Sequence, residues 1–368
     1  MTLIFSSSRL GAAFLMGDTL LTYNNNTISS RIELPSQFLP GSEIGARGIA
    51  DLMQKVMILD QTFAVGWSGG LIEATEAIRE LDRRMTYPFS PDAMAALQAD
   101  AEMRRTFGEV SIVFLGIFDR DPMQKQARSM VGGWNAEEWL PQTPDAPKVF
   151  TGGSGAYHFM NYLNAGPTTF SREGEPGFLP TPLEADVGYF ANRFAAVVLR
   201  EAFDETSLNF FYGGAFELVL LGDEGRLEKV PYCLVWWVLE GQKLTLRGPA
   251  IVANYDSEGA FVIRRAHLAD TELNRDTEFK VLASIPEFSA RNVTATKPSL
   301  YVHAIKGPDT TRIVLGMESE HEFRLTLNEK TGRPHFTISR SFANYLRRET
   351  GTNELAIAGT DRRVVTLI

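Results

Sequence analysis

Residues 2–18 read TLIFSSSRLGAAFLMGD, and this stretch decides how the fold begins. Two short apolar runs, at residues 2–5 and 11–16, are separated by the polar and turn-prone residues 6–11. We expect the two runs to form a hairpin that enters a sheet, and a third strand to continue through residues 19–24. Thr2 stands directly behind the initiator methionine, and Asp18 closes the second run.

The composition limits the class of protein. The chain has 368 residues, of which 44% are hydrophobic and 22% charged, so one large folded domain or two ordinary ones are expected. A formal net charge of −9 argues against nucleic-acid and anionic-membrane partners, because no basic excess can neutralise phosphates. Cys233 is the only cysteine, which fits a reducing compartment. Neither a signal peptide nor a long apolar span is evident, so a cytoplasmic protein without a membrane partner is expected.

The order of strand and helix patterns suggests two domains. Residues 24–51 read as a long loop, residues 55–70 as two strands around a turn, and residues 71–85 as an amphipathic helix. Further along, residues 148–163 read as strand, glycine turn and helix, residues 184–203 as a long helix, and residues 213–230 as a hairpin. Beyond that point strand-like runs predominate, so we place a boundary that gives domains 1–230 and 231–368, the second β-rich and of unknown role.

The first domain resembles a known family in the order and texture of these segments. The stretches MTLIFSSSRLGAAFLMGD (1–18), KVMILDQTFAVGWSGG (55–70), FTGGSGAYHF (150–159) and EADVGYFANRFAAVVLREAF (184–203) are similar to proteasome β-subunits and simpler bacterial proteasome-like peptidases. Those are N-terminal-nucleophile (Ntn) hydrolases. The resemblance covers about residues 2–230. It implies an α+β fold, a four-layer αββα sandwich, followed here by a smaller β-rich C-terminal domain.

Thr2 lies where the family keeps its nucleophilic threonine, which becomes the first residue once Met1 is removed. A threonine hydroxyl is a poor nucleophile, and the free α-amine of the same residue can accept its proton. An α-amine titrates near pH 8, so a useful fraction is already basic at neutral pH. The alternative is that Thr2 only starts a strand.

The resemblance also assigns Asp18, Lys55 and Gly69. A buried Lys55, kept charged by Asp18, would lower the pKa of the α-amine and orient the nucleophile. The backbone N–H of Gly69 would stabilise the oxyanion, since glycine leaves the approach of the substrate carbonyl open. As alternatives, Asp18 could be a turn residue, Lys55 a surface lysine and Gly69 part of a structural turn before a helix.

Further positions match less specifically. Ser154, in the sequence GGSGAYHF, falls on the family's glycine–serine–glycine turn near the nucleophile's amine, although a helix N-cap explains it equally well. Thr22 matches the position that pairs with an extended substrate, and Trp67 matches a pocket-lining position, with a core role as its alternative. The family's second aspartate has no clear counterpart, because Asn209 stands at its position and Asp204 lies five residues earlier.

The leading hypothesis is therefore a threonine-type peptidase or amidohydrolase, with no metal or organic cofactor. The resemblance implies a peptide or protein substrate, a homo-oligomeric ring and an unfoldase ATPase as partner. A second hypothesis is a catalytically inactive proteasome-like shell or binding protein, which Asn209 favours. A third is a small-amide hydrolase on the same fold, because fold alone does not fix the substrate.

Overall fold

The structure is a computed structural model, and its description covers fourteen segments of the chain. They are residues 2–9, 12–22, 34–35, 49–121, 126–139, 148–165, 212–222, 225–266, 277–289, 300–307, 311–317, 323–327, 334–357 and 365–367. The long helix predicted over residues 184–203 lies outside these segments. So does most of the loop predicted over residues 24–51.

Two sheets pack face to face in the N-terminal half. The six-stranded sheet has the order β12 (Leu227–Lys229), β11 (Phe216–Leu221), β2 (Ala12–Asp18), β1 (Ile4–Arg9), β10 (Lys148–Gly152) and β9 (Glu137–Trp139). The four-stranded sheet has the order β5 (Val56–Asp60), β6 (Phe63–Ser68), β7 (Ser111–Asp121) and β8 (Gln126–Trp134). Buried aliphatic side chains fill the space between them, among them Ile4, Leu15, Val113 and Leu115. The hydrophobic effect therefore holds the two sheets together.

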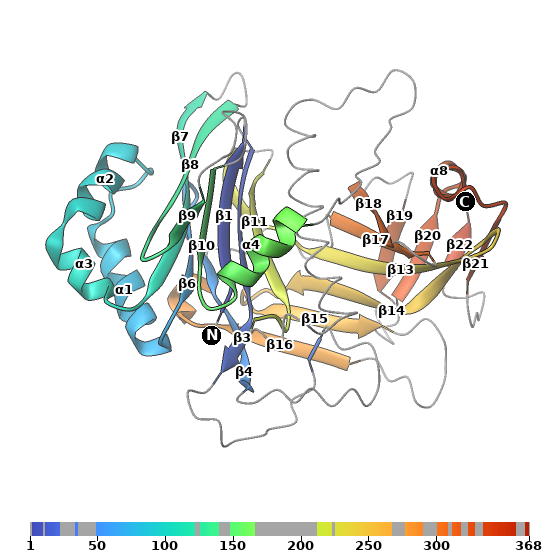
Figure 1. Ribbon diagram of the computed structural model, residues 1–368, viewed down its shortest axis with the longest axis horizontal. Coiled ribbons are helices and arrows are strands. Elements are labelled where there is room, and N and C mark those ends of the chain that lie inside the picture. Colours follow the sequence, from blue (N-terminus) through green and yellow to red (C-terminus); the bar gives the residue numbers. More distant parts are fainter. Residues whose placement is uncertain are drawn as a thin grey trace.

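Helices cover the outer face of the four-stranded sheet (Figure 1). They are α1 (Leu71–Arg84), α2 (Pro91–Ala99) and α3 (Ala101–Phe107). The helix predicted over residues 71–85 is confirmed, and its predicted apolar positions Ala74, Ile78 and Leu81 are all buried. Helices α2 and α3 were not predicted from the sequence. In the structure Asp100 accepts hydrogen bonds from two N–H groups at the start of α3, which is the contact expected of an N-cap.

A nine-stranded sheet joins distant parts of the chain. Its order is β18 (Thr311–Met317), β17 (Leu300–Lys306), β13 (Tyr232–Glu240), β14 (Lys243–Tyr255), β15 (Phe261–Ala266), β16 (Thr277–Ala283), β4 (Ile49–Gln54) and β3 (Leu20–Thr22), and β21 (Glu354–Ile357) pairs with β14. The link is a parallel pairing of β16 with β4, in which Leu282 lies opposite Met53. Strands on either side of residue 230 thus share one sheet, and the domain boundary placed there stays a prediction.

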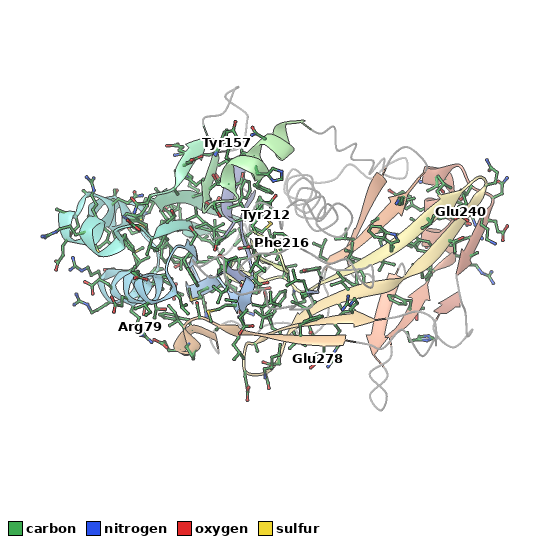
Figure 2. The ribbon with its side chains drawn as sticks, turned by 60° about the horizontal axis from the view of Figure 1, so that its bottom comes forward. Arg79, Tyr157, Tyr212, Phe216, Glu240 and Glu278 are labelled. Atoms are coloured by element: carbon green, nitrogen blue, oxygen red, sulfur yellow. The ribbon has the colours of Figure 1, made fainter. Side chains whose placement is uncertain are left out.

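The second face of the six-stranded sheet packs against both a helix and this larger sheet. Helix α4 (Ala156–Ala165) contributes Phe159, whose ring lies edge-on to Phe5 with centroids 5.1 Å apart. Strands β13 to β17 of the nine-stranded sheet contribute further side chains to the same buried cluster. Tyr212 and Phe216, which also belong to it, lie close together near the middle of the molecule (Figure 2).

The predicted four-layer αββα sandwich is wrong. The described residues form twenty-two strands in four sheets and six helices, so the architecture is mostly β. The physical reason lies in β3 and β4, which lie outside the two N-terminal sheets: β4 pairs with β16 of the C-terminal half, and β3 pairs with β4. As a result, strands of the nine-stranded sheet cover much of the face where the sequence analysis expected a second helical layer.

The far end of the molecule is a smaller β unit. A three-stranded sheet of β19 (Phe323–Leu327), β20 (Pro334–Ile338) and β22 (Val365–Leu367) lies near α8 (Arg340–Thr350) (Figure 1). The remaining described helix is α7 (Pro286–Ser289). Within the described segments, no helix combines the length and apolar character needed to cross a membrane.

Candidate functional site

The site lies where the chain passes from one sheet to another. Strand β2 of the six-stranded sheet ends at Asp18, and β3 of the nine-stranded sheet begins at Leu20. Lys55 separates β4 of the nine-stranded sheet from β5 of the four-stranded sheet. Thr2 directly precedes the first residues of the β1–β2 hairpin, in which Ile4 lies opposite Gly17. These crossings bring three residues of the sequence prediction to one place.

Lys55 contacts both of the other residues directly. Its Nζ lies 2.7 Å from Thr2 Oγ and 2.9 Å from Asp18 Oδ1. It also donates to the carbonyl of Leu20, at 2.5 Å. Thr2 is 2% exposed, and Lys55 and Asp18 are fully buried. The alternative of a surface lysine at position 55 is therefore excluded.

Asp18 is fixed by the backbone as well as by Lys55. The N–H of Leu3 donates to its Oδ1 at 3.1 Å, and the N–H of Gly213 donates to its Oδ2 at 2.8 Å. The carboxylate thus holds the residue that follows Thr2. It also connects to the glycine pair at 213 and 214, where φ is positive at both residues. Positive φ is readily adopted only by glycine.

Burial shifts the ionisation of the ion pair. Removal from water lowers the pKa of Lys55 below the ordinary value of a lysine, and the negative charges of Asp18 and Glu217 only partly offset this. Burial likewise raises the pKa of Asp18, while Lys55 and the two backbone donors oppose that rise. A larger fraction of Lys55 is therefore neutral at a given pH than of a lysine in water.

The turn after β10 contacts the carbonyl of Thr2 closely. The N–H of Gly155 donates to Thr2 O at 3.2 Å. Gly153 has φ +90, and a Cβ added there would lie 2.0 Å from Thr2 O. Ser154 lies between these glycines and is exposed. The structure thus places the predicted glycine–serine–glycine turn beside Thr2, with glycine required at 153 by close approach.

We expect Gly153→Ala to destabilise the protein by about 2–4 kcal/mol, because it combines a strained φ with a clash against backbone. Gly241→Ala is the matched control, since Gly241 also has positive φ, at +60, but has no atom within 4 Å of an added Cβ. Its cost is strain alone, about 1 kcal/mol. Urea unfolding of both variants checks this, and equal losses would contradict the close approach at Thr2.

Ser68, the residue before Gly69, lies close to the same turn. A Cβ on Gly153 would be 3.3 Å from the Cβ of Ser68. Gly69 itself is exposed and has φ +120, immediately before Gly70, the N-cap of α1. A side chain at position 69 would meet the backbone of residues 109 and 110. Glycine therefore has a structural reason here in addition to the predicted role.

The two substrate-binding candidates differ in their surroundings. Thr22 is half-buried on β3, the edge strand of the nine-stranded sheet, and lies opposite Ile49 of β4. Trp67 is 1% exposed in the core beneath α1, and its indole N–H donates to Ser284 Oγ at 3.1 Å. The core role that the sequence left open for Trp67 fits this environment, and its pocket-lining role stays a prediction.

Some predictions cannot be placed, and some residues of the site were missed. Met1, Asp204 and Asn209 lie outside the described residues. The sequence analysis missed the Gly213 N–H that binds Asp18, although the glycine pair at 213 and 214 was visible. No group of three or more His, Cys, Asp or Glu side chains within the described segments is arranged to hold a metal ion.

Comparison with known proteins does not assign the chain to a family. No family model matches the sequence, and a search of curated proteins finds no match.

Proposed function

We propose that this protein is a threonine-type peptidase or amidohydrolase in which Thr2, exposed by removal of Met1, is an N-terminal nucleophile. The observation that carries the proposal is the 2.7 Å contact between Thr2 Oγ and a fully buried Lys55 Nζ. A hydroxyl next to a lysine that is itself paired with a carboxylate is an arrangement that activates nucleophiles. The resemblance to proteasome-like Ntn hydrolases supports it.

The residues have separate roles in the proposed reaction. Thr2 Oγ attacks the carbonyl carbon of an amide, and its proton passes to the Thr2 α-amine. As an ammonium, Lys55 donates to Thr2 Oγ and favours the neutral form of the nearby α-amine. Asp18 orients Lys55 and, through Leu3 N–H, the start of the chain. The Gly69 N–H stabilises the oxyanion, with Ser154 beside the amine.

Bond breaking and product release then follow. The carbon–nitrogen bond of the tetrahedral intermediate breaks, and the leaving amine takes the proton from the α-ammonium. The product is an ester on Thr2 Oγ. Water, deprotonated by the same α-amine, attacks this ester and releases the acid, which regenerates the hydroxyl. An extended peptide would be bound through its main chain beside β3, near Thr22.

The resemblance extends the proposal to partners and location. We propose that the protein forms a homo-oligomeric ring that encloses the sites. We also propose an unfoldase ATPase as its partner and a cytoplasmic location. The single, buried Cys233 supports a reducing compartment. A small amide is the alternative substrate, and parallel trials of fluorogenic peptides and simple amides distinguish the two.

The proposal predicts a covalent adduct at the start of the chain. We expect the intact mass of the purified protein to lack one methionine. After treatment with a peptide epoxyketone, which reacts with an adjacent amine and hydroxyl together, the mass should rise by one whole inhibitor. Peptide mapping should place the adduct on Thr2. Burial raises the pKa of the Cys233 thiol, so the competing nucleophile stays protonated and enclosed.

Two results would overturn the proposal. One is a mass that retains Met1, because the Thr2 nitrogen would then be an amide without basicity. The other is a mature chain that takes no adduct from epoxyketones or β-lactones of varied side chain. Either result would favour the inactive shell or binding protein.

A further inference from the structure

A second buried ion pair lies directly behind Lys55. Glu217 of β11 and Lys229 of β12 are 0% and 4% exposed, and Lys229 Nζ donates to Glu217 Oε1 at 2.7 Å. The other oxygen, Oε2, accepts from the backbone N–H of Lys55 at 3.0 Å and of Val56 at 3.3 Å. The reaction proposed above uses none of these contacts.

The contact with Lys55 compensates for a break in the sheets. Lys55 lies between β4 and β5, so its N–H has no place in a strand ladder. A buried N–H without an acceptor is costly, and Glu217 supplies the acceptor. Glu217 therefore fixes the backbone of Lys55, and with it the point from which the Lys55 side chain extends.

Gly17 permits the close approach of Glu217 to the backbone of Lys55 and Val56. It lies opposite Glu217 in the pairing of β11 with β2. A Cβ on Gly17 would be 2.7 Å from a methyl group of Val56. Because Gly17 has no side chain, the start of β5 comes close enough to β2 and β11 for Glu217 to reach both N–H groups.

The C-terminal half holds the other end of the network. Lys229 Nζ also donates to Gln54 Oε1 at 2.7 Å, and Gln54 Nε2 donates to the carbonyls of Gly259 and Val281, both at 3.0 Å. The hydroxyl of Tyr255 donates to Glu217 Oε1 at 3.4 Å, and Lys229 Nζ lies over its ring, 5.0 Å from the centroid. Gln54 immediately precedes Lys55, so the turn between β14 and β15, which carries Gly259, and strand β16, which carries Val281, both contact the residue next to the proposed site.

From these contacts we infer that Glu217 is a positioning residue for Lys55, and that Lys229, Tyr255, Gly259 and Val281 support the proposed site by holding Glu217 and Gln54. This inference rests on the proposed function and gives the β-rich half a role in it. Asp18 is paired with Lys55 and Glu217 with Lys229, and such pairing is what buried charged groups require.

Glu217→Gln tests the inference, because an amide keeps the shape but turns an NH₂ group toward one set of donors. We expect the rate constant of Thr2 inactivation by the epoxyketone to fall about 10- to 100-fold, as a misplacement of about 1 Å would cause. The inhibitor's binding constant should change less than about twofold, because the substrate-binding edge β3 is untouched. A purely structural role would leave the rate constant unchanged in the folded fraction.

Two further variants complete the test. Lys229→Met should lower the rate constant less, and the loss in the double variant should be smaller than the sum of the two single losses, since Lys229 acts through Glu217 as well as through Gln54. Additive losses would overturn the inference. Glu228→Gln is the matched control, because Glu228 lies next to Lys229 on β12 but pairs with Arg226 outside the network. It should leave the rate unchanged.

A crystal structure of the Glu217→Gln protein separates this inference from the proposed function. If the wild-type protein takes no adduct, the proposed function fails, but the distance from Lys55 Nζ to Thr2 Oγ remains measurable. A distance still at 2.7 Å in the variant would overturn the positioning role. Loss of the hydrogen bond would support it. Should Glu217→Gln fail to fold, the same distance is measured in Lys229→Met.

Discussion

Thr2→Ala should abolish hydrolysis, lowering kcat/KM at least about 10³-fold, because the attacking oxygen is removed and no other residue replaces it. Thr2→Ser should retain most of the chemistry, because serine keeps both the hydroxyl and the adjacent amine. The same variants should respectively lose and keep the epoxyketone adduct. Steady-state assays on peptide and simple-amide substrates, with intact mass spectrometry of each protein, check both results.

A stability measurement shows whether the loss of activity in Thr2→Ala comes from unfolding. Thr2→Ala removes one acceptor of Lys55, so we expect a cost of about 1–2 kcal/mol in the free energy of unfolding. The variant should stay folded at room temperature. A folded Thr2→Ala protein with unchanged activity would exclude Thr2 as the nucleophile.

Lys55→Met should have the second large effect, on activity and on stability together. It leaves Asp18 buried without its cation, a change that typically costs about 3–5 kcal/mol. Activity should fall at least about 10³-fold, because Thr2 Oγ loses the ammonium that orients it. Urea denaturation and the rate of epoxyketone inactivation measure the two effects.

A second substitution separates the two effects of Lys55→Met. Asn at position 18 can still accept from one backbone N–H and carries no charge, so Lys55→Met/Asp18→Asn should recover much of the lost stability. It should recover none of the activity. Recovery of activity along with stability would show that Lys55 only supports the fold.

One contact of the site follows from local spacing in the sequence, whereas the roles of Asp18, Lys55 and Gly69 were predicted only through the family resemblance. The hairpin prediction for residues 2–18 places the residue after Thr2 beside Asp18, and the structure has that contact. A charged residue in an otherwise apolar strand also signals a buried partner. Glu217 stands between Phe216 and Leu218 in such a strand, so its burial could have been predicted from the same sequence that predicted the hairpin.

The fold was harder to predict, because its decisive contacts join distant segments. Residues 49–54 follow a stretch rich in glycine and proline, and residues 49–51 were predicted as the end of a loop. They form β4, whose partner is β16 at Leu282 and Ala283. No local pattern specifies a pairing over such a separation, because strand propensity describes a strand and not its neighbour.

The pairing of β4 with β16 also sets the order of events during synthesis. While a nascent chain is still on the ribosome, the side-chain NH₂ group of Gln54 lacks these two acceptors until the carbonyls of Gly259 and Val281 have emerged. Contacts of such high sequence separation form slowly and late. A partly translated chain therefore carries Thr2 and Lys55 without the framework that aligns them, and its hydrolytic capacity, if Thr2 acts as proposed, arises only after the β-rich half has been made.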